Sequence, residues 1–111
     1  MKIETQNYDK ITVIELHGEL IEEFVKKLQD TASSVIASGV SGIVLDMTNV
    51  SFIDSKGLEQ LLWLGDYCDE NKRQLKFTGF DESCSKILEI TRLGPRFDTY
   101  AELTEAVKSF A

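Results

Sequence analysis

The sequence contains little proline, histidine or cysteine, the residues that interrupt helices, bind metals or form disulfides. Its 111 residues include one proline, one histidine and two cysteines. No stretch approaches the roughly 20 consecutive apolar residues of a membrane-spanning helix. The N-terminal segment MKIETQNYDK mixes apolar with polar residues, so we expect no signal peptide. We therefore expect a cytoplasmic protein with no segment inserted in a membrane.

Basic residues are also scarce. The chain has 12 Lys and Arg against 19 Asp and Glu, which gives a formal net charge of −7. This excess of acid disfavours binding to nucleic acid or to an anionic membrane, because phosphate groups are bound by Lys and Arg. Apolar residues make up 42% of the chain, which is enough for one core at this length. We expect a single domain over residues 1–111.

The two cysteines give no sign of metal binding. Cys68 and Cys84 form neither a CxxC pair nor a zinc-ligand spacing with His17. In a cytoplasmic chain, such cysteines are typical of reduced thiols in or near the core. Walker A and GxGxxG motifs are absent as well. We predict no metal site and no cofactor.

Hydrophobic periodicity and turn residues predict alternating strands and helices. Strands are expected at residues 2–6, 10–18, 42–47, 74–80 and 96–100. Helices are expected at residues 20–36 and 55–70. A third helix is expected to begin after a cap at Asp81 or Ser83 and to carry Ile87, Leu88 and Ile90 on its apolar side. The last helix is expected at residues 103–110, after a capping box at Thr99–Glu102. The order β-β-α-β-α-β-α-β-α predicts an α/β fold, a sheet covered by helices.

The segment NVSFIDSKGLEQLL, residues 49–62, breaks two helix rules at once. An apolar run ends at Asp54, and Ser55 is expected to cap a helix. Lys56 then places a cation at the positive end of the helix dipole, which costs roughly 0.3–1 kcal/mol. Gly57 in the first turn costs up to about 1 kcal/mol relative to alanine. Either a partner approaches this turn closely, or Gly57 serves internal packing and Lys56 is simply solvated; the sequence leaves both open.

The same helix carries a second candidate surface. Its expected core side is the stripe Leu58, Leu61, Leu62, Gly65 and Cys68. Gln60, Trp63 and Tyr67 fall with Lys56 on the opposite side. Exposed aromatic residues often anchor protein–protein interfaces. Packing of both aromatic rings under a neighbouring helix is an equally good explanation.

At these residues the sequence resembles the STAS domain family, named after sulfate transporters and anti-sigma factor antagonists. The resemblance lies in IVLDMTNVSFIDSKGLEQLL, in which a strand ends in Asp and an apolar pair leads into an Asp-Ser-x-Gly-Leu turn. The positions that match the family pattern are Asp46, Phe52, Ile53, Asp54, Ser55, Lys56, Gly57 and Leu58. The segment LHGEL, residues 16–20, resembles a second family landmark before the first helix.

The resemblance implies a mixed central sheet of four or five strands with about four helices, mainly on one face. It implies a regulatory protein that binds a partner and is not an enzyme. Stand-alone bacterial members bind a kinase-like anti-sigma factor, which frees the sigma factor for transcription. The expected binding loop here is Asp54, Ser55, Lys56, Gly57 and Leu58. An alternative is an accessory subunit that docks on the ATPase of an ABC-type lipid transporter.

The sequence departs from the family pattern at the regulatory position. In relatives the anti-sigma factor phosphorylates a Ser or Thr in this turn, and the position corresponds to Lys56 here. A lysine cannot form a phosphate ester, so Ser55 is the remaining candidate phosphoacceptor. The usual switch is therefore expected to be absent or altered. A hydrolytic set of His17, Ser55 and Asp54 is a remote alternative, because no GxSxG elbow accompanies it.

Overall fold

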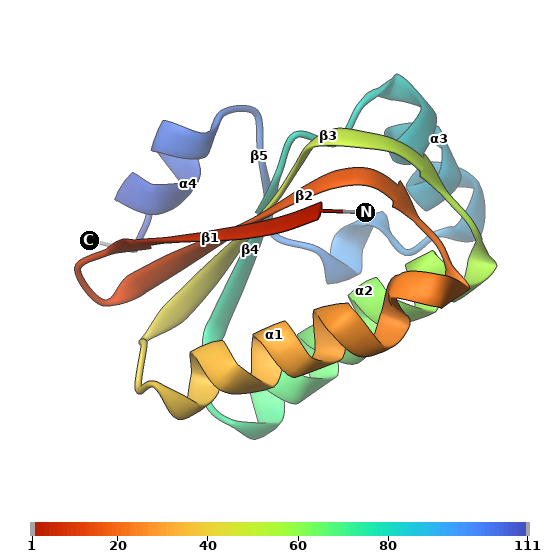
Figure 1. Ribbon diagram of the computed structural model, residues 1–111. Coiled ribbons are helices and arrows are strands. Elements are labelled where there is room, and N and C mark those ends of the chain that lie inside the picture. Colours follow the sequence, from red (N-terminus) through yellow and green to blue (C-terminus); the bar gives the residue numbers. More distant parts are fainter. Residues whose placement is uncertain (1, 111) are drawn as a thin grey trace.

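The computed structural model describes residues 2–110, which form a five-stranded sheet with helices on both faces (Figure 1). Along the chain the elements are β1 (Lys2–Tyr8), β2 (Ile11–Leu20), the 3-10 helix η1 (Glu22–Phe24), α1 (Val25–Ala37), β3 (Gly42–Ile53), α2 (Ser55–Glu70), β4 (Gln74–Thr78), α3 (Glu82–Thr91), the 3-10 helix η2 (Gly94–Arg96), β5 (Thr99–Tyr100) and α4 (Leu103–Lys108). The predicted order of strands and helices is confirmed.

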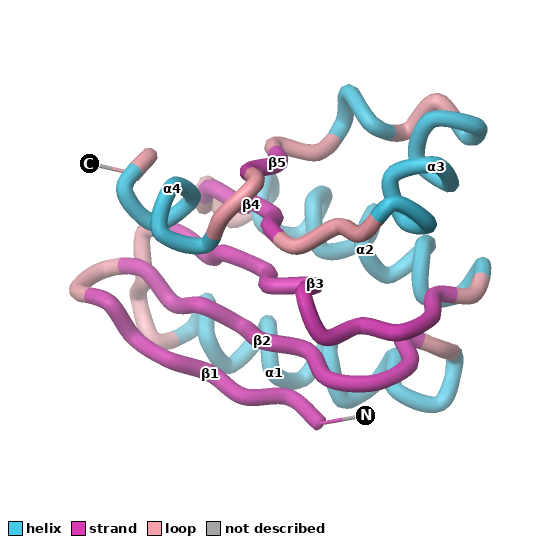
Figure 2. Tube along the Cα trace, turned by 90° about the horizontal axis from the view of Figure 1, so that it is seen from above, coloured by secondary structure: helices cyan, strands magenta, loops and turns pink. Residues whose placement is uncertain are grey.

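The sheet is mixed, and its strands lie in the order of the chain, β1-β2-β3-β4-β5. β1 pairs antiparallel with β2 through a hairpin, whereas β2 to β5 are parallel neighbours. Figure 2 shows this order from above, with α1 and α2 beneath the sheet. Parallel neighbours need a crossover connection, which α1, α2 and α3 supply. The predicted mixed sheet and its helical cover are confirmed.

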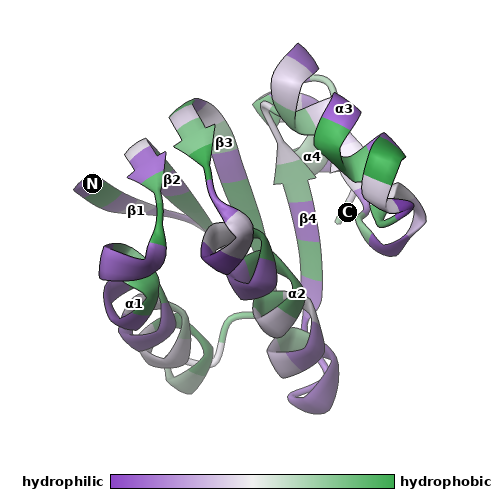
Figure 3. Ribbon diagram, turned by 90° about the vertical axis from the view of Figure 1, so that its right-hand side faces the viewer, coloured by the Kyte–Doolittle hydropathy of each residue, from purple (hydrophilic) through white to green (hydrophobic). Residues whose placement is uncertain are grey.

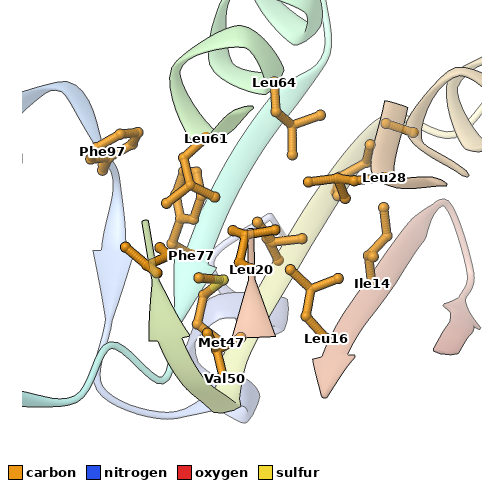
Figure 4. Packing of buried hydrophobic residues seen from close by; sticks show 14 of the residues in the cluster. Ile14, Leu16, Leu20, Leu28, Met47, Val50, Leu61, Leu64, Phe77 and Phe97 are labelled. Carbon is orange, nitrogen blue, oxygen red and sulfur yellow. The ribbon is translucent and has the colours of Figure 1, made fainter. Parts of the chain in front are cut away.

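The two faces of the sheet carry cores of different size. Alternate side chains of each strand point to opposite faces, so Ile14 and Leu16 face the helices α1 to α3 while Ile11 and Val13 face α4. The large core lies on the α1–α3 side (Figure 4), and it includes Ile14, Leu16, Leu20, Leu28, Met47, Val50, Leu61, Leu64, Phe77 and Phe97. The small core on the α4 side consists of Ile11, Val13, Val44 and Ala106.

The colouring of Figure 3 follows this division: hydrophobic stretches mark β3 and β4, and hydrophilic residues gather on the outer turns of α1 and α2. Within the described residues, no helix is both long enough and apolar enough to cross a membrane.

Several predicted boundaries were wrong. β2 continues to Leu20 and α1 starts only at Val25, because the chain makes a 3-10 turn between them. β3 runs six residues beyond the predicted end at 47, to Ile53. Its second half pairs with β2 alone, since β4 ends opposite Asp46.

The C-terminal part also differs from the prediction. Asp81 caps α3 as expected, but Ile90 is 72% exposed and lies outside the core. Of the predicted strand at 96–100, only Thr99–Tyr100 pairs with β4. The prediction of a capping box before α4 was wrong as well. Thr99 belongs to β5, and Glu102, the N-cap residue of α4, makes no side-chain cap hydrogen bond.

Candidate functional site

The turn from β3 into α2 is fixed by Asp54. Its side-chain Oδ1 accepts a hydrogen bond from the Gly57 amide at 2.7 Å, and its backbone oxygen accepts from the Leu58 amide at 3.0 Å. Asp54 is thus the N-cap, and its negative charge also suits the positive end of the helix dipole. The prediction that Ser55 is the cap was wrong, because an aspartate one residue earlier supplies the stronger acceptor.

Gly57 is required by packing inside the domain. The residue is buried, and a Cβ atom added to it would collide with the backbone carbonyl oxygen of Leu20, at the end of β2. The same carbonyl accepts a hydrogen bond from the Asp54 amide at 3.3 Å, so it is held in place. The glycine therefore lets the start of α2 approach β2, which is the internal-packing explanation that the sequence left open.

The side chains between these two fixed residues point outward. Ser55 is exposed, and its hydroxyl makes no hydrogen bond to any described residue. The side chain of Lys56 is 51% exposed, and its Nζ lies 3.5 Å from Glu59 Oε2, one turn along the helix. An exposed pair of this kind adds little stability. The turn therefore presents a free hydroxyl and a nearly free cation.

Phe52 adds an apolar side chain to the same end of the domain. It is 54% exposed on β3, two residues before the cap, whereas Ile53 beside it is buried. The prediction of an apolar pair did not distinguish the two side chains. The strand alternation could have revealed it, because Ile53 and Phe52 must point to opposite sides.

The residues of the predicted partner face on α2 are less exposed than expected. Gln60 is buried with 8% exposure, and its Oε1 accepts a hydrogen bond from Gln29 Nε2 of α1 at 2.8 Å. Trp63 and Tyr67 stack on each other with ring centroids 4.9 Å apart, and both pack half-buried against the large core.

The buried stripe of α2 is thus rotated relative to the predicted one. The buried residues of α2 are Gly57, Gln60, Leu61, Leu64 and Cys68. Leu58, Leu62 and Gly65 of the predicted stripe are only partly buried, because α1 covers the side on which Gln60 lies.

In the described part of the chain, the hollow beside the turn is too small for a substrate. The hollow lined by Ile53, Leu58 and Leu61 holds only about 10 Å³. Two residues of the imagined hydrolytic set are engaged elsewhere: His17 lies against Glu15, and Asp54 caps α2. This arrangement suits a surface that binds another macromolecule.

The cysteines are buried and free, as predicted. Burial raises the pKa of the Cys68 thiol to about 11, and burial together with Asp81 raises the pKa of the Cys84 thiol to about 11. Both thiols are therefore poor nucleophiles near neutral pH.

Comparison with known proteins agrees with this geometry. The chain is 28% identical over 93 residues to the anti-sigma-B factor antagonist of Staphylococcus aureus, a match that covers 84% of this chain and 86% of the relative. The fold is similar to that of an anti-sigma factor antagonist from Mycobacterium paratuberculosis (TM-score 0.85, 19% identity, 97% and 92% of the two chains). It is also similar to Bacillus SpoIIAA in its phosphorylated form (TM-score 0.76, 21% identity, 99% and 100% of the two chains).

The family model of the STAS domain matches residues 2–106, almost the whole length of the chain. The protein therefore belongs to the STAS domain family.

Proposed function

We propose that this protein is an anti-sigma factor antagonist, which binds a kinase-like anti-sigma factor and so releases a sigma factor for transcription. The observation that supports the proposal is that the residues at the turn before α2 fall into two groups, one with internal contacts and one exposed to solvent. Asp54 and Gly57 serve internal contacts, while Phe52, Ser55 and Lys56 face solvent. The names of the relatives point to the same function. The protein would act in the cytoplasm as a binding module without catalytic activity of its own.

The exposed residues suit a partner surface. Phe52 offers a large apolar group that loses its remaining contact with water when a partner covers it, and such residues dominate binding energy in many interfaces. Lys56 adds a positive charge on an otherwise acidic protein, which favours an acidic patch on the partner. Gly57 is buried and Leu58 packs partly buried against the large core, so both lie on the inner side of the loop. Gln60 is excluded from this surface by its burial under α1.

The binding test compares two exposed apolar residues. In Phe52→Ser and Ile90→Ser, each variant loses one large apolar side chain from the surface. We expect Phe52→Ser to weaken binding to the host's anti-sigma factor at least tenfold in a titration calorimeter, and Ile90→Ser to bind like the wild type. Equal binding by Phe52→Ser and the wild type would contradict the proposed surface. Recovery of a transporter ATPase instead of an anti-sigma factor, in a pull-down from the host, would favour the transporter alternative.

The regulation of this surface is proposed to differ from that of phosphorylated relatives. Lys56 occupies the position at which family members carry the regulatory hydroxyl, so the usual modification cannot occur there. Ser55 has a free hydroxyl, since Asp54 and not Ser55 caps the helix. Its neighbour Lys56 would neutralise part of an added phosphate, whose charge at pH 7 is about −1.5 to −2. We therefore propose that the kinase activity of the anti-sigma factor does not stop this protein from binding it.

A kinase assay with the host's anti-sigma factor and ATP tests this regulation. Intact-mass measurement is expected to show no phosphate on the wild type and one phosphate on Lys56→Ser, which restores a hydroxyl at the usual position. Ser55→Ala serves as the control for modification of the neighbouring residue. Stoichiometric phosphate on Ser55 of the wild type would refute the proposed loss of the switch, without bearing on whether the two proteins bind.

A further inference from the structure

One part of the sheet carries no helix on its α4 side. α4 packs over Ile11, Val13 and Val44, and Figure 2 shows the first residues of β1 and the second half of β2 running beyond it uncovered. Glu4, Glu15 and His17 lie in this uncovered part. The sequence separates Glu4 from the other two by more than ten residues, so spacing alone did not reveal the group.

The strand register brings the three side chains together. Glu4 lies directly opposite Glu15 in the antiparallel pair β1–β2, and His17 follows Glu15 by two residues on the same face. One ligand atom from each of the three residues lies within 4.8 Å of the other two. Like charges directly opposite in a sheet are unfavourable, so this corner of the molecule needs a counter-charge.

Nε2 of His17 is aimed into the group and has no hydrogen-bond partner among residues 2–110. Its Nε2 is enclosed and lies 2.8 Å from Glu15 Oε1, but not in the geometry of a hydrogen bond, and no other described residue bonds to it. When the neutral imidazole carries its proton at Nδ1, the lone pair of Nε2 faces the carboxylate oxygen across this short distance. A proton or a metal ion can fill that place.

The present counter-charge is loosely held. Lys2 Nζ lies 2.7 Å from Glu4 Oε1, and the side chain of Lys2 is 71% exposed. The hydrogen bond and the charge of this contact lower the pKa of Glu4 and raise the pKa of Lys2. Asn49 Nδ2 of β3 donates to Glu15 Oε1 at 3.2 Å and orients that carboxylate from behind. Glu15 is thus positioned from a second strand, whereas the lysine can swing away into water.

We propose that Glu4, Glu15 and His17 bind a divalent transition-metal ion of the zinc class. Carboxylate oxygens alone would suit Mg²⁺ or Ca²⁺, but the imidazole nitrogen shifts the preference toward zinc. With metal–ligand bonds of about 2.0–2.2 Å, ligand atoms around a tetrahedral zinc ion lie about 3.3 Å apart. The ligand atoms lie up to 4.8 Å apart, and the partly exposed side chains of Glu4 and Glu15 would have to rotate to bring them to this value. The open side of the face leaves the fourth position to water.

The test uses the single histidine of the chain. ZnCl₂ is titrated into the full-length protein, and the imidazole signals of His17 are followed by NMR; they are expected to shift and saturate with zinc but not with MgCl₂. Glu15→Gln is expected to weaken zinc binding at least tenfold. Lys2→Gln removes the competing cation and is expected to strengthen binding several-fold. Glu70→Gln, which makes the same charge change at the exposed end of α2, is the matched control.

Three results would overturn the proposal. The first is an absence of saturable change at His17 up to roughly millimolar zinc. The second is equal affinity of Glu15→Gln and Glu70→Gln, which would show a general effect of charge. The third is full zinc affinity in His17→Ala, which would place the ion elsewhere on the protein. Circular dichroism of each variant confirms that it is folded, so weaker binding is not confused with unfolding.

Discussion

The substitution Gly57→Ala tests whether the glycine in the turn serves the fold. In a helix without neighbours, alanine would be more stable than glycine by up to about 1 kcal/mol. Here the new Cβ would lie 3.0 Å from the Leu20 carbonyl carbon and 3.1 Å from Leu20 Cγ, and closer still to the Leu20 oxygen. That oxygen is held by the Asp54 amide, so the start of α2 must move away from β2.

Two costs follow from this movement. Overpacking against a fixed group typically costs about 1–3 kcal/mol, and weakening the Asp54 cap adds about 1 kcal/mol. After subtraction of the gain in helix propensity, we expect Gly57→Ala to lower the free energy of unfolding by about 2 kcal/mol. Urea denaturation followed by circular dichroism measures this difference.

Gly65→Ala is the matched control on the same helix. A Cβ at Gly65 has no neighbouring atom within 4 Å, so only the propensity gain remains, and the variant should be more stable than the wild type by up to about 1 kcal/mol. The two alanine substitutions thus have opposite expected signs. If Gly57→Ala were as stable as Gly65→Ala, the internal-packing role of Gly57 would be refuted.

Three further predictions concern the helix cap, a buried lysine on β4 and the two thiols. Asp54→Ala should lower the free energy of unfolding by about 1 kcal/mol, whereas Ser55→Ala should leave it unchanged within about 0.5 kcal/mol; equal losses would show that the cap is shared. Lys76 is buried on β4, where its Nζ donates to Tyr100 Oη and Ser109 Oγ at 3.2 and 2.8 Å. Lys76→Ala should therefore lower the free energy of unfolding, measured by urea denaturation, by about 2 kcal/mol. A loss below about 0.5 kcal/mol would contradict a stabilising role of these hydrogen bonds. Because the thiol pKa values are raised from 9.0 to about 11 in the folded state, unfolded thiols lose protons first, and stability should fall between pH 9 and pH 11; a Cys68→Ala/Cys84→Ala double variant should show a shallower fall.

The order of elements could be predicted from the sequence because periodicity and turn residues are local signals. GIVLDM reads as a buried strand by itself, and Asp81 sits where a cap is needed. The ends of the strands and helices depend instead on the elements that pair with them or pack against them. β3 continues to Ile53 because β2 offers backbone partners along its whole length, and the polar residues Thr48 and Asn49 in between gave no sign of a strand.

The turn before α2 could be located from the sequence, but the contacts of its residues could not. Asp54 and Ser55 are both good caps, and only the hydrogen bond to the Gly57 amide decides between them. Gln60 looks like a surface residue in isolation, yet Gln29 on α1 satisfies its amide in the interior. The pairing of Glu4 with Glu15 depends on the register between β1 and β2, which cannot be read from either strand alone.

The division into a large and a small core has a consequence for how unfolding is measured. The chain has one tryptophan, and Trp63 packs against the large core, while α4 rests on the small core across the sheet. Tryptophan fluorescence therefore reports on the α1–α2 side of the molecule and does not detect undocking of α4. Far-UV circular dichroism detects both events, so agreement between the two signals is the criterion for treating this domain as a single cooperative unit.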